Sequence, residues 1–280
     1  MERRQSVELY LGIGLIMVLT AFAVMAPFFT NYDPHQTDAE RWLQSPGREH
    51  FFGTDRLGRD IYSRVVYGAR VSLAVGILAM LLSITVGTAL GSLAGYFGGF
   101  ADQLIMRLTD IVLVFPTMLL ALTLVAIFEP AIWLVVLVIG GTGWPAVARL
   151  VRGEILRLKS LEFAAASRML GASHWRVLLV HLLPNALGPI LVAATVAVPA
   201  AIMTEAGLGY FGLGIQPPIP TWGNMLREAQ NYIRYAWWYA TFPGAAIFLT
   251  VFAFHLIGEG LRQRINPMSQ VGRGRRAYYH

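Results

Sequence analysis

Cysteine is absent from all 280 residues of the chain, and its absence excludes several classes of function. Such a chain forms no disulfide, has no thiolate nucleophile and offers no cysteine-based metal site. Six histidines are scattered without a metal-ligand spacing, so we interpret them as packing or interfacial residues; they are His35, His50, His174, His181, His255 and His280. We therefore expect no catalytic residue, no metal site and no cofactor in this chain.

Charged residues are scarce too. They make up 14% of the chain against 56% hydrophobic residues, with a mean hydropathy of +0.55. A chain with this balance cannot bury its apolar surface in one soluble core, so it belongs in a membrane. The net charge of +6 would suit nucleic acid, but the arginines lie mainly in short connectors, where the positive-inside rule explains them better. We expect an all-α polytopic protein that contacts membrane lipid and binds no nucleic acid.

Six apolar stretches are candidates to cross a bilayer, since a span needs about 20 residues. They cover residues 9–29, 71–97, 101–128, 131–151, a fifth run from Pro184 to about residue 203, and 237–260. The first resembles a signal peptide, but its apolar run is too long and Pro27 would block cleavage, so we expect an uncleaved helix with a cytoplasmic N-terminus. Pro116 predicts a kink in the third span, and the run GGTGWP predicts an interruption in the fourth.

The fifth span is rich in proline. Each proline removes a backbone donor, so this helix should be kinked or broken, and such breaks are tolerated where they face protein or a cavity. We therefore interpret it as lining a translocation path and assign to that path Pro184, Asn185, Gly188, Pro189 and Pro199.

Two further patterns concern packing. In the third span, Arg107 and Asp110 stand three residues apart, which predicts a local ion pair near the cytoplasmic end. In the second span, small residues recur at intervals of four, a pattern that lets transmembrane helices approach closely; they are Ser83, Gly87, Gly91 and Gly95. This stripe suits packing within the bundle and packing on a partner subunit equally well.

Two runs resemble phosphate loops only superficially. Residues 31–70 contain Gly-Thr-Asp and Gly-Arg-Asp within a neutral mixture of six arginines and six acids. No strand precedes this run and its acids would repel phosphate, so we expect an amphipathic segment at the outer membrane surface. The run from Gly153 to Ser160 has Leu158 where a phosphate loop needs its second glycine. We do not expect the chain to hydrolyse ATP.

The stretch LEFAAASRMLGASHWRVLLVHLLP, residues 161–184, is a structured polar break between apolar segments. Ser160 is a candidate N-cap, Glu162 lies in the first turn, and Gly171 can end the helix in a left-handed conformation. Ser173 would cap a second helix. From residue 161 to 170 the helix would be about 15 Å long, too short to cross a bilayer. Its small residues would let another protein approach the backbone; they are Ala164, Ala165, Ala166 and Ser167.

This stretch resembles the cytoplasmic EAA loop of ABC importer permeases. Gly171 and Leu183-Pro184 match the loop pattern, while Ala165 replaces its Glu, Ser167 its second Ala and His181 its Ile. Other motifs extend the resemblance over nearly the whole chain, to the inner-membrane permeases of dipeptide, oligopeptide and nickel ABC importers; they are FGTDRLGRD (52–60), AGYFGG (94–99), MRLTD (106–110), FGLGIQPP (211–218) and GEGLR (258–262).

The resemblance implies a type I importer permease fold with six transmembrane helices and a cytoplasmic coupling helix between spans 4 and 5. It divides the chain into residues 1–68, a permease domain at 69–262 and a cytoplasmic tail at 263–280. The residues implied in coupling to an ATPase are Glu162, Ala164, Ala165, Ala166, Ser167, Arg168, Gly171 and Ala172.

The same resemblance implies partners and a substrate class. The partners are a second, related permease, two cytoplasmic subunits that bind ATP, and an extracytoplasmic substrate-binding protein, all at a bacterial inner membrane. A peptide is the expected substrate and nickel the alternative. An ion-coupled secondary transporter would instead need a titratable group within the membrane, for which Glu205 is the main candidate.

Overall fold

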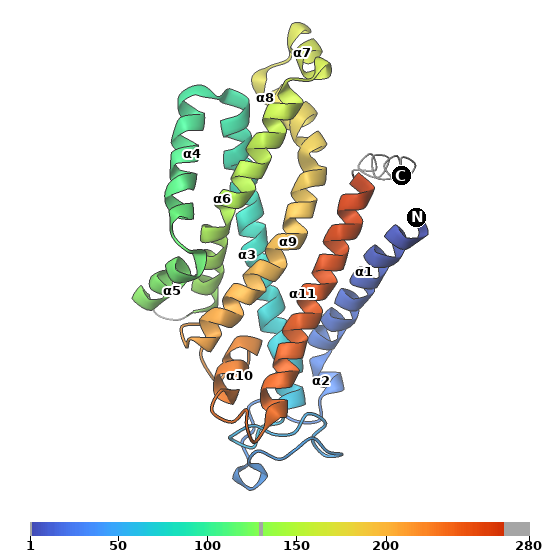
Figure 1. Cartoon of the computed structure of the whole chain (residues 1–280), viewed down its shortest axis with the longest axis vertical. Helices are drawn as coiled ribbons and strands as arrows, with labels where there is room; N and C mark the ends of the chain where they lie inside the picture. Colours follow the sequence, from blue (N-terminus) through green and yellow to red (C-terminus); the bar gives the residue numbers. More distant parts are fainter. Residues whose placement is uncertain (1, 129–130, 266–280) are drawn as a thin grey trace, which may run out of the picture.

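A computed structural model describes residues 2–128 and 131–265 (Figure 1). Most of the cytoplasmic tail expected at 263–280 lies outside these residues. The helices are α1 (Glu2–Val24), α2 (Ala26–Phe29), a 3-10 turn (Ala39–Arg41), α3 (Ile61–Phe97), α4 (Gly99–Val114), α5 (Thr117–Ile127), α6 (Ile132–Lys159), α7 (Glu162–Met169), α8 (His174–Arg176), a π-helical turn (Val177–Leu182), α9 (Leu183–Tyr210), α10 (Trp222–Ala229) and α11 (Trp237–Ile265).

The expectation of an all-α polytopic chain is confirmed. Five helices are long and apolar enough to span a membrane, and the bent pair α4–α5 makes a sixth span if it is counted as one. The start of α1, the end of α11 and α7 all lie toward one end of the molecule, which we name the α7 end (Figure 1). Residues 31–60 and α10 lie at the opposite end, which we name the α10 end.

The longest helix, α3, packs along α6 through the predicted stripe of small residues. A side chain at Gly91 would lie 2.5 Å from the Ala148 carbonyl oxygen, and one at Gly87 would lie equally close to the Val147 side chain. Ser83 Oγ donates a hydrogen bond to the Gly140 carbonyl at 2.9 Å. The stripe therefore serves packing within the chain. The domain boundary that the resemblance implies between residues 68 and 69 falls within α3 and stays a prediction.

Two predicted helix breaks have different outcomes. At Pro116 the chain turns by 86° between α4 and α5, which confirms the kink. The predicted interruption at GGTGWP is wrong, because α6 continues through it. Gly140 and Gly143 lie against Leu82 and Ser83 of α3, so these glycines allow close helix packing rather than ending the helix.

Residues 31–60 form an ordered cap over the ends of the helices instead of the expected amphipathic segment. The ring of Phe52 stacks on Phe242 of α11 at 3.8 Å, and Trp238 Nε1 donates to the Thr54 carbonyl at 3.4 Å. Gly58 adopts a φ of +72°, and a side chain there would collide with the Asp38 backbone. The glycines of this run therefore shape a turn.

Candidate functional site

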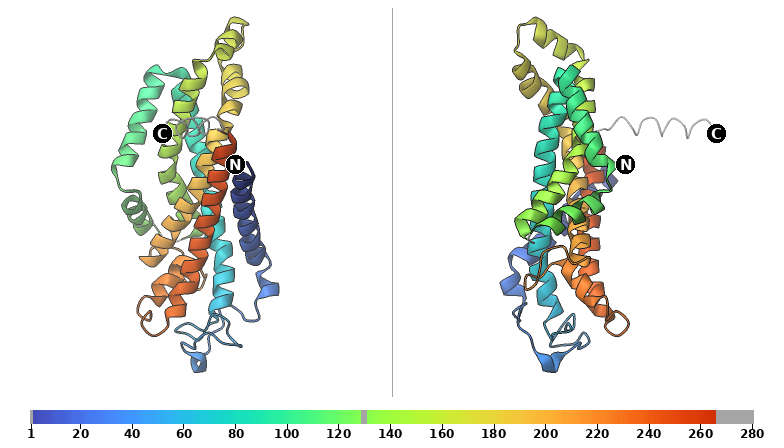
Figure 2. Two further views of the ribbon diagram at one scale, coloured as in Figure 1. Left: turned by 45° about the vertical axis from the view of Figure 1, so that its right-hand side comes forward. Right: turned by 90° about the vertical axis from the view of Figure 1, so that its left-hand side faces the viewer.

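The short helix α7 stands at the extreme α7 end of the molecule, beyond the ends of the bundle helices (Figures 1 and 2). Its eight residues are all described, and Ala164 is the only one buried. Met169 and the following Leu170 are 83% and 88% exposed. An apolar surface of this kind at the tip of a projecting helix is typical of a binding surface.

The helix α7 terminates at its C-terminus as predicted. Gly171 adopts a φ of +81°, and its N–H donates to the Arg168 carbonyl at 3.0 Å. The Ala172 N–H donates to the Ser167 carbonyl at 3.1 Å. These two bonds make a Schellman motif, which satisfies carbonyls left free at the end of a helix. Gly171 therefore sets the direction in which the chain leaves α7.

The start of α7 differs from the prediction. Glu162 lies in the first turn, but the residue before the helix is Leu161 and no side chain caps it. The predicted cap is wrong, because Ser160 still belongs to the end of α6, where its hydroxyl bonds the Arg157 carbonyl at 2.8 Å. Ser173 does cap α8 by accepting from the Arg176 N–H.

The predicted small residues of α7 divide between two faces. Ala164 packs into the bundle in one cluster with Leu158 and Val177, so its small size lets α7 approach its own chain. Ala166 is exposed, and Ala165 and Ser167 are half-buried. The face available to a partner is therefore narrower than the sequence predicts. Arg168 is exposed but turns back onto its own helix, where its Nε donates to the Ala164 carbonyl at 3.2 Å.

The π-helical turn Val177–Leu182 connects this region to α9. Within it, the Leu183 N–H bonds the Leu178 carbonyl five residues back. Such turns are rare and frequently mark functional sites. Here the turn ends two residues before Pro184, which lies in the first turn of α9, where its missing N–H costs little. α9 itself continues to Tyr210 through Pro189 and Pro199, so the prolines do not break it.

A groove of about 460 Å³ lies between α9, α6 and the bent pair α4–α5. Its α9 wall consists of small and apolar residues, with Thr204 at one limit; the others are Val192, Ala193, Val196, Ala197, Ala200 and Ala201. Across the groove lie Thr117 and Thr142, among other residues. The residues lining it, all within the described chain, include no Asp, Glu, Lys, Arg or His.

The residues predicted to line the path do not line this groove. Pro184 and Asn185 are exposed nearer the α7 end, and a side chain at Gly188 would meet Ile265 of α11. Pro189 and Pro199 are half-buried elsewhere on α9. α9 thus bounds this groove through other residues, and the assignment of those five residues to a translocation path stays a prediction.

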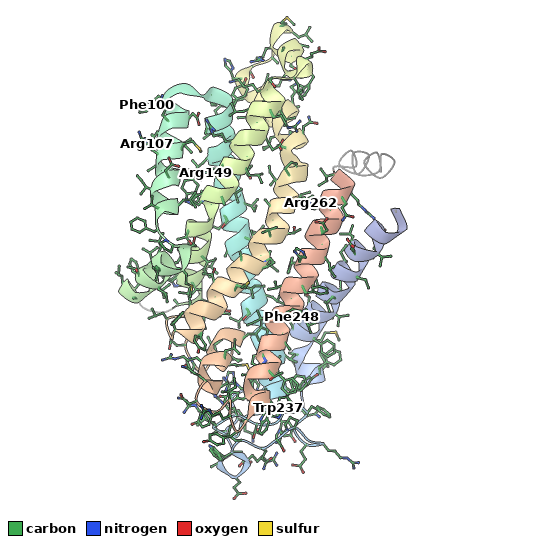
Figure 3. The ribbon with its side chains drawn as sticks, viewed as in Figure 1. Phe100, Arg107, Arg149, Trp237, Phe248 and Arg262 are labelled. Atoms are coloured by element: carbon green, nitrogen blue, oxygen red, sulfur yellow. The ribbon has the colours of Figure 1, made fainter. Side chains whose placement is uncertain are left out.

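The predicted ion pair within α4 is wrong. Asp110 pairs with Arg149 of α6, with Nη2 and Oδ1 2.6 Å apart, and not with Arg107. Figure 3 labels Arg107 on α4 and Arg149 on the neighbouring α6. A second pair, Asp102 with Arg152, also joins these helices, with Nη2 and Oδ2 2.6 Å apart. The acidic residues of α4 therefore form ion pairs with α6, and not with a residue one turn away in α4.

Sequence reasoning missed a buried ionic cluster at the α10 end. Asp55 accepts hydrogen bonds from Arg59 Nε at 2.6 Å and from Arg64 Nη1. Glu228 Oε2 of α10 accepts from Arg59 Nη2 at 2.7 Å, Arg64 Nη1 at 3.0 Å and Tyr239 Oη at 2.7 Å. Two arginines thus neutralise two carboxylates, and the cluster joins residues 31–60 to α3, α10 and α11. Its only sequence signal is the charge balance of residues 31–70.

Glu205, the candidate for an ion-coupled mechanism, is completely buried in α9. Its Oε2 accepts from Ser72 Oγ of α3 at 3.1 Å, and that Oγ accepts from the Trp222 N–H of α10 at 3.4 Å. Glu205 is not among the residues that line the groove. Its contacts indicate that it joins three helices at the α10 end.

Comparison with known proteins relates this geometry to a family. Residues 87–268 match the family described as binding-protein-dependent transport system inner membrane component. The chain is similar to the dipeptide transport system permease protein DppC of Alkalihalophilus pseudofirmus, with 43% identity over 258 residues, 91% of this chain and 84% of that protein. It is also similar to the glutathione transport system permease protein GsiD of Pectobacterium atrosepticum, with 43% identity over 265 residues, 94% of this chain and 88% of that protein.

Two further similarities agree with this family relationship. The oligopeptide transport system permease protein OppC of Bacillus subtilis is 39% identical over 256 residues, 91% of this chain and 84% of that protein. A chain of the inward-facing MetNI methionine ABC transporter superposes with a TM-score of 0.61, covering 73% of this chain and 97% of its own length. At 19% identity, the last similarity concerns the fold alone.

Proposed function

The chain belongs to the family of binding-protein-dependent transport system inner membrane components, and on this premise we propose that it is a permease subunit of an ATP-driven peptide importer. It is a multi-pass inner-membrane protein of a class that is not itself catalytic. The observation that carries the peptide assignment is the set of relatives named for dipeptides, oligopeptides and glutathione, which match at least 91% of the chain.

The family name implies a binding protein, and ABC importers are driven by ATPases. We propose the finer composition of one related second permease, two ATPases that bind the ATP, and one extracytoplasmic binding protein. The α7 end then faces the cytoplasm, and α7 is the coupling helix that enters an ATPase groove. The exposure of Met169 and Leu170 beside the Schellman turn supports this role.

We assign the translocation path to the groove along α9. Its side chains carry no charge that would hold either terminus of a peptide. The hydroxyls of Thr142 and Thr204 bond carbonyls of their own helices at 2.9 and 2.8 Å, and Ser83 bonds Gly140. A wall without fixed charges, on which three of the four side-chain hydroxyls already have partners, suits peptides of many sequences. Selectivity then rests with the binding protein.

Reconstitution tests the proposal. Proteoliposomes holding the chain, its second permease and the ATPases, supplied with the binding protein, should accumulate a labelled dipeptide only when ATP is hydrolysed. Omission of the binding protein should abolish uptake. Uptake of Ni²⁺ without peptide would select the nickel alternative, and uptake driven by a proton gradient without ATP would contradict the proposal.

A further inference from the structure

One side chain of α3, Tyr96, contacts both ends of the segment that carries α7. The segment leaves the bundle at Lys159, the last residue of α6, and returns at His174, the first residue of α8. Lys159 Nζ donates to the Tyr96 carbonyl oxygen at 2.5 Å and lies 5.4 Å from the centroid of its ring. The Tyr96 hydroxyl is hydrogen-bonded to His174 Nδ1 at 3.1 Å.

Each contact has a physical basis. The Tyr96 carbonyl lies in the last turn of α3, where carbonyls lack partners within the helix and a nearby cation is favoured by the helix dipole. Lys159, the only lysine of the chain, supplies that cation. The ring of the neighbouring Phe97 lies edge-on to Trp175 at 5.5 Å. The end of α3 thus holds the end of α6 and the start of α8 at once.

Burial makes this arrangement stiff. Tyr96 is 4% exposed and packs in one hydrophobic cluster with Leu158, Val177 and Ala164, the only buried residue of α7. α3 continues for 37 residues, about 55 Å at 1.5 Å per residue. At its other end Arg64 joins the ionic cluster with Asp55 and Glu228.

We propose that Tyr96 is a positioning residue for energy coupling. It fixes both ends of the α7 segment to α3, so that a displacement of α7 by the ATPases moves α3 instead of bending the connections on either side of α7. This inference rests on the proposed function, and it assigns a role to a residue of the AGYFGG motif that lies outside the coupling loop.

The test measures peptide transported per ATP hydrolysed in the reconstituted complex. Tyr96→Phe removes the hydroxyl and keeps the ring, so folding and ATPase copurification should remain at wild-type levels. We expect the ratio to fall about fivefold, the equivalent of about 1 kcal/mol for one hydrogen bond. His174→Leu removes the same bond from an exposed position and should have the same effect.

A double-mutant cycle tests whether the two substitutions act by removing the same hydrogen bond or by separate effects on packing. If the two groups act through one bond, Tyr96→Phe combined with His174→Leu should lower the ratio no further than either change alone. Tyr67→Phe is the matched control, because Tyr67 lies in the other half of α3, where its ring faces Arg70 at 5.1 Å. It should leave the ratio unchanged.

The outcomes are distinguishable. A wild-type ratio in both single variants, or additive losses in the double variant, would overturn the role of Tyr96 and leave the proposed function standing. A wild-type complex that neither takes up peptide nor hydrolyses more ATP with loaded binding protein would overturn the proposed function, and the inference with it.

Discussion

At the scale of the residue, Gly171 carries the sharpest backbone constraint in the segment that contains α7. Apart from its chain neighbours, a side chain there would meet no atom of the described residues within 4 Å, so the constraint is the φ of +81° itself. A β-branched residue strongly disfavours that conformation, at a cost of about 1–3 kcal/mol. We predict that Gly171→Val inserts and pairs with its partner permease but binds the ATPases poorly or fails to couple hydrolysis to uptake. Copurification of the ATPases and substrate-stimulated hydrolysis measure this.

Two variants control for the substitution itself. Gly153→Val places the same side chain at an exposed position within α6, where no neighbouring atom lies within 4 Å, and should retain ATPase binding. Gly171→Asn should retain much of the function, since asparagine tolerates the left-handed region. Normal coupling in Gly171→Val would show that α7 is not the coupling element.

A prediction about a single residue holds when its interaction partner lies close by in the sequence. Gly171 and Ser173 act on backbone groups within five residues, so composition and spacing were sufficient to identify them. Asp110 was assigned to Arg107, three residues away, yet pairs with Arg149, 39 residues away. The sequence shows both arginines, but only the packing of α4 on α6 selects between them.

At the scale of the element, the buried ionic cluster anchors α10 and the cap of residues 31–60. Arg59 and Arg64 are both nearly fully buried. Glu228→Gln would leave them with Asp55 as their only carboxylate in the cluster. Breaking a buried pair by removing one partner costs about 3–5 kcal/mol. We therefore predict a clear fall in the thermal unfolding temperature of the purified complex.

The matched control is Glu259→Gln in α11. Glu259 pairs with Arg262, whose side chain is 68% exposed, and exposed pairs contribute about 0–1 kcal/mol. This variant should unfold close to the wild-type temperature. Equal shifts for Glu228→Gln and Glu259→Gln would contradict the account of the cluster as an anchor.

The helices themselves were largely predictable, because about 20 apolar residues suffice to identify a span. The positions at which helices break were harder to predict. Pro116 ends a helix, whereas Pro145, Pro189 and Pro199 lie inside α6 and α9. Gly140 and Gly143 of α6 are explained by the approach of α3, which no local pattern reveals. Glu228 was missed for the same reason, since its arginine partners lie more than 160 residues away.

At the scale of the whole molecule, ion pairs of three arginines reduce a difficulty with membrane orientation. The six arginines of residues 31–70 count against the positive-inside rule if those residues lie outside the cell. Arg59 and Arg64 are neutralised in the cluster, and Arg41 pairs with Asp38 at 3.1 Å. Arg41 and Arg59 are thus bound within the folded cap, and Arg64 is bound at the start of α3. The arrangement supports placing the α10 end outside.

Single introduced cysteines test this orientation without background labelling of the protein, since the chain has no cysteine of its own. Ser45 is exposed in the cap, and Arg262 is exposed at the far end of α11 from Trp237 (Figure 3). We predict that a membrane-impermeant maleimide labels Ser45→Cys in intact spheroplasts. Arg262→Cys should be labelled only after permeabilisation, because α11 spans the bilayer and ends on the side of α7. If both cysteines react only after permeabilisation, an even number of spans separates Ser45 from Arg262 and the six-span arrangement is wrong. Labelling of Arg262→Cys in intact spheroplasts would place α7 outside, where it could not face an ATPase.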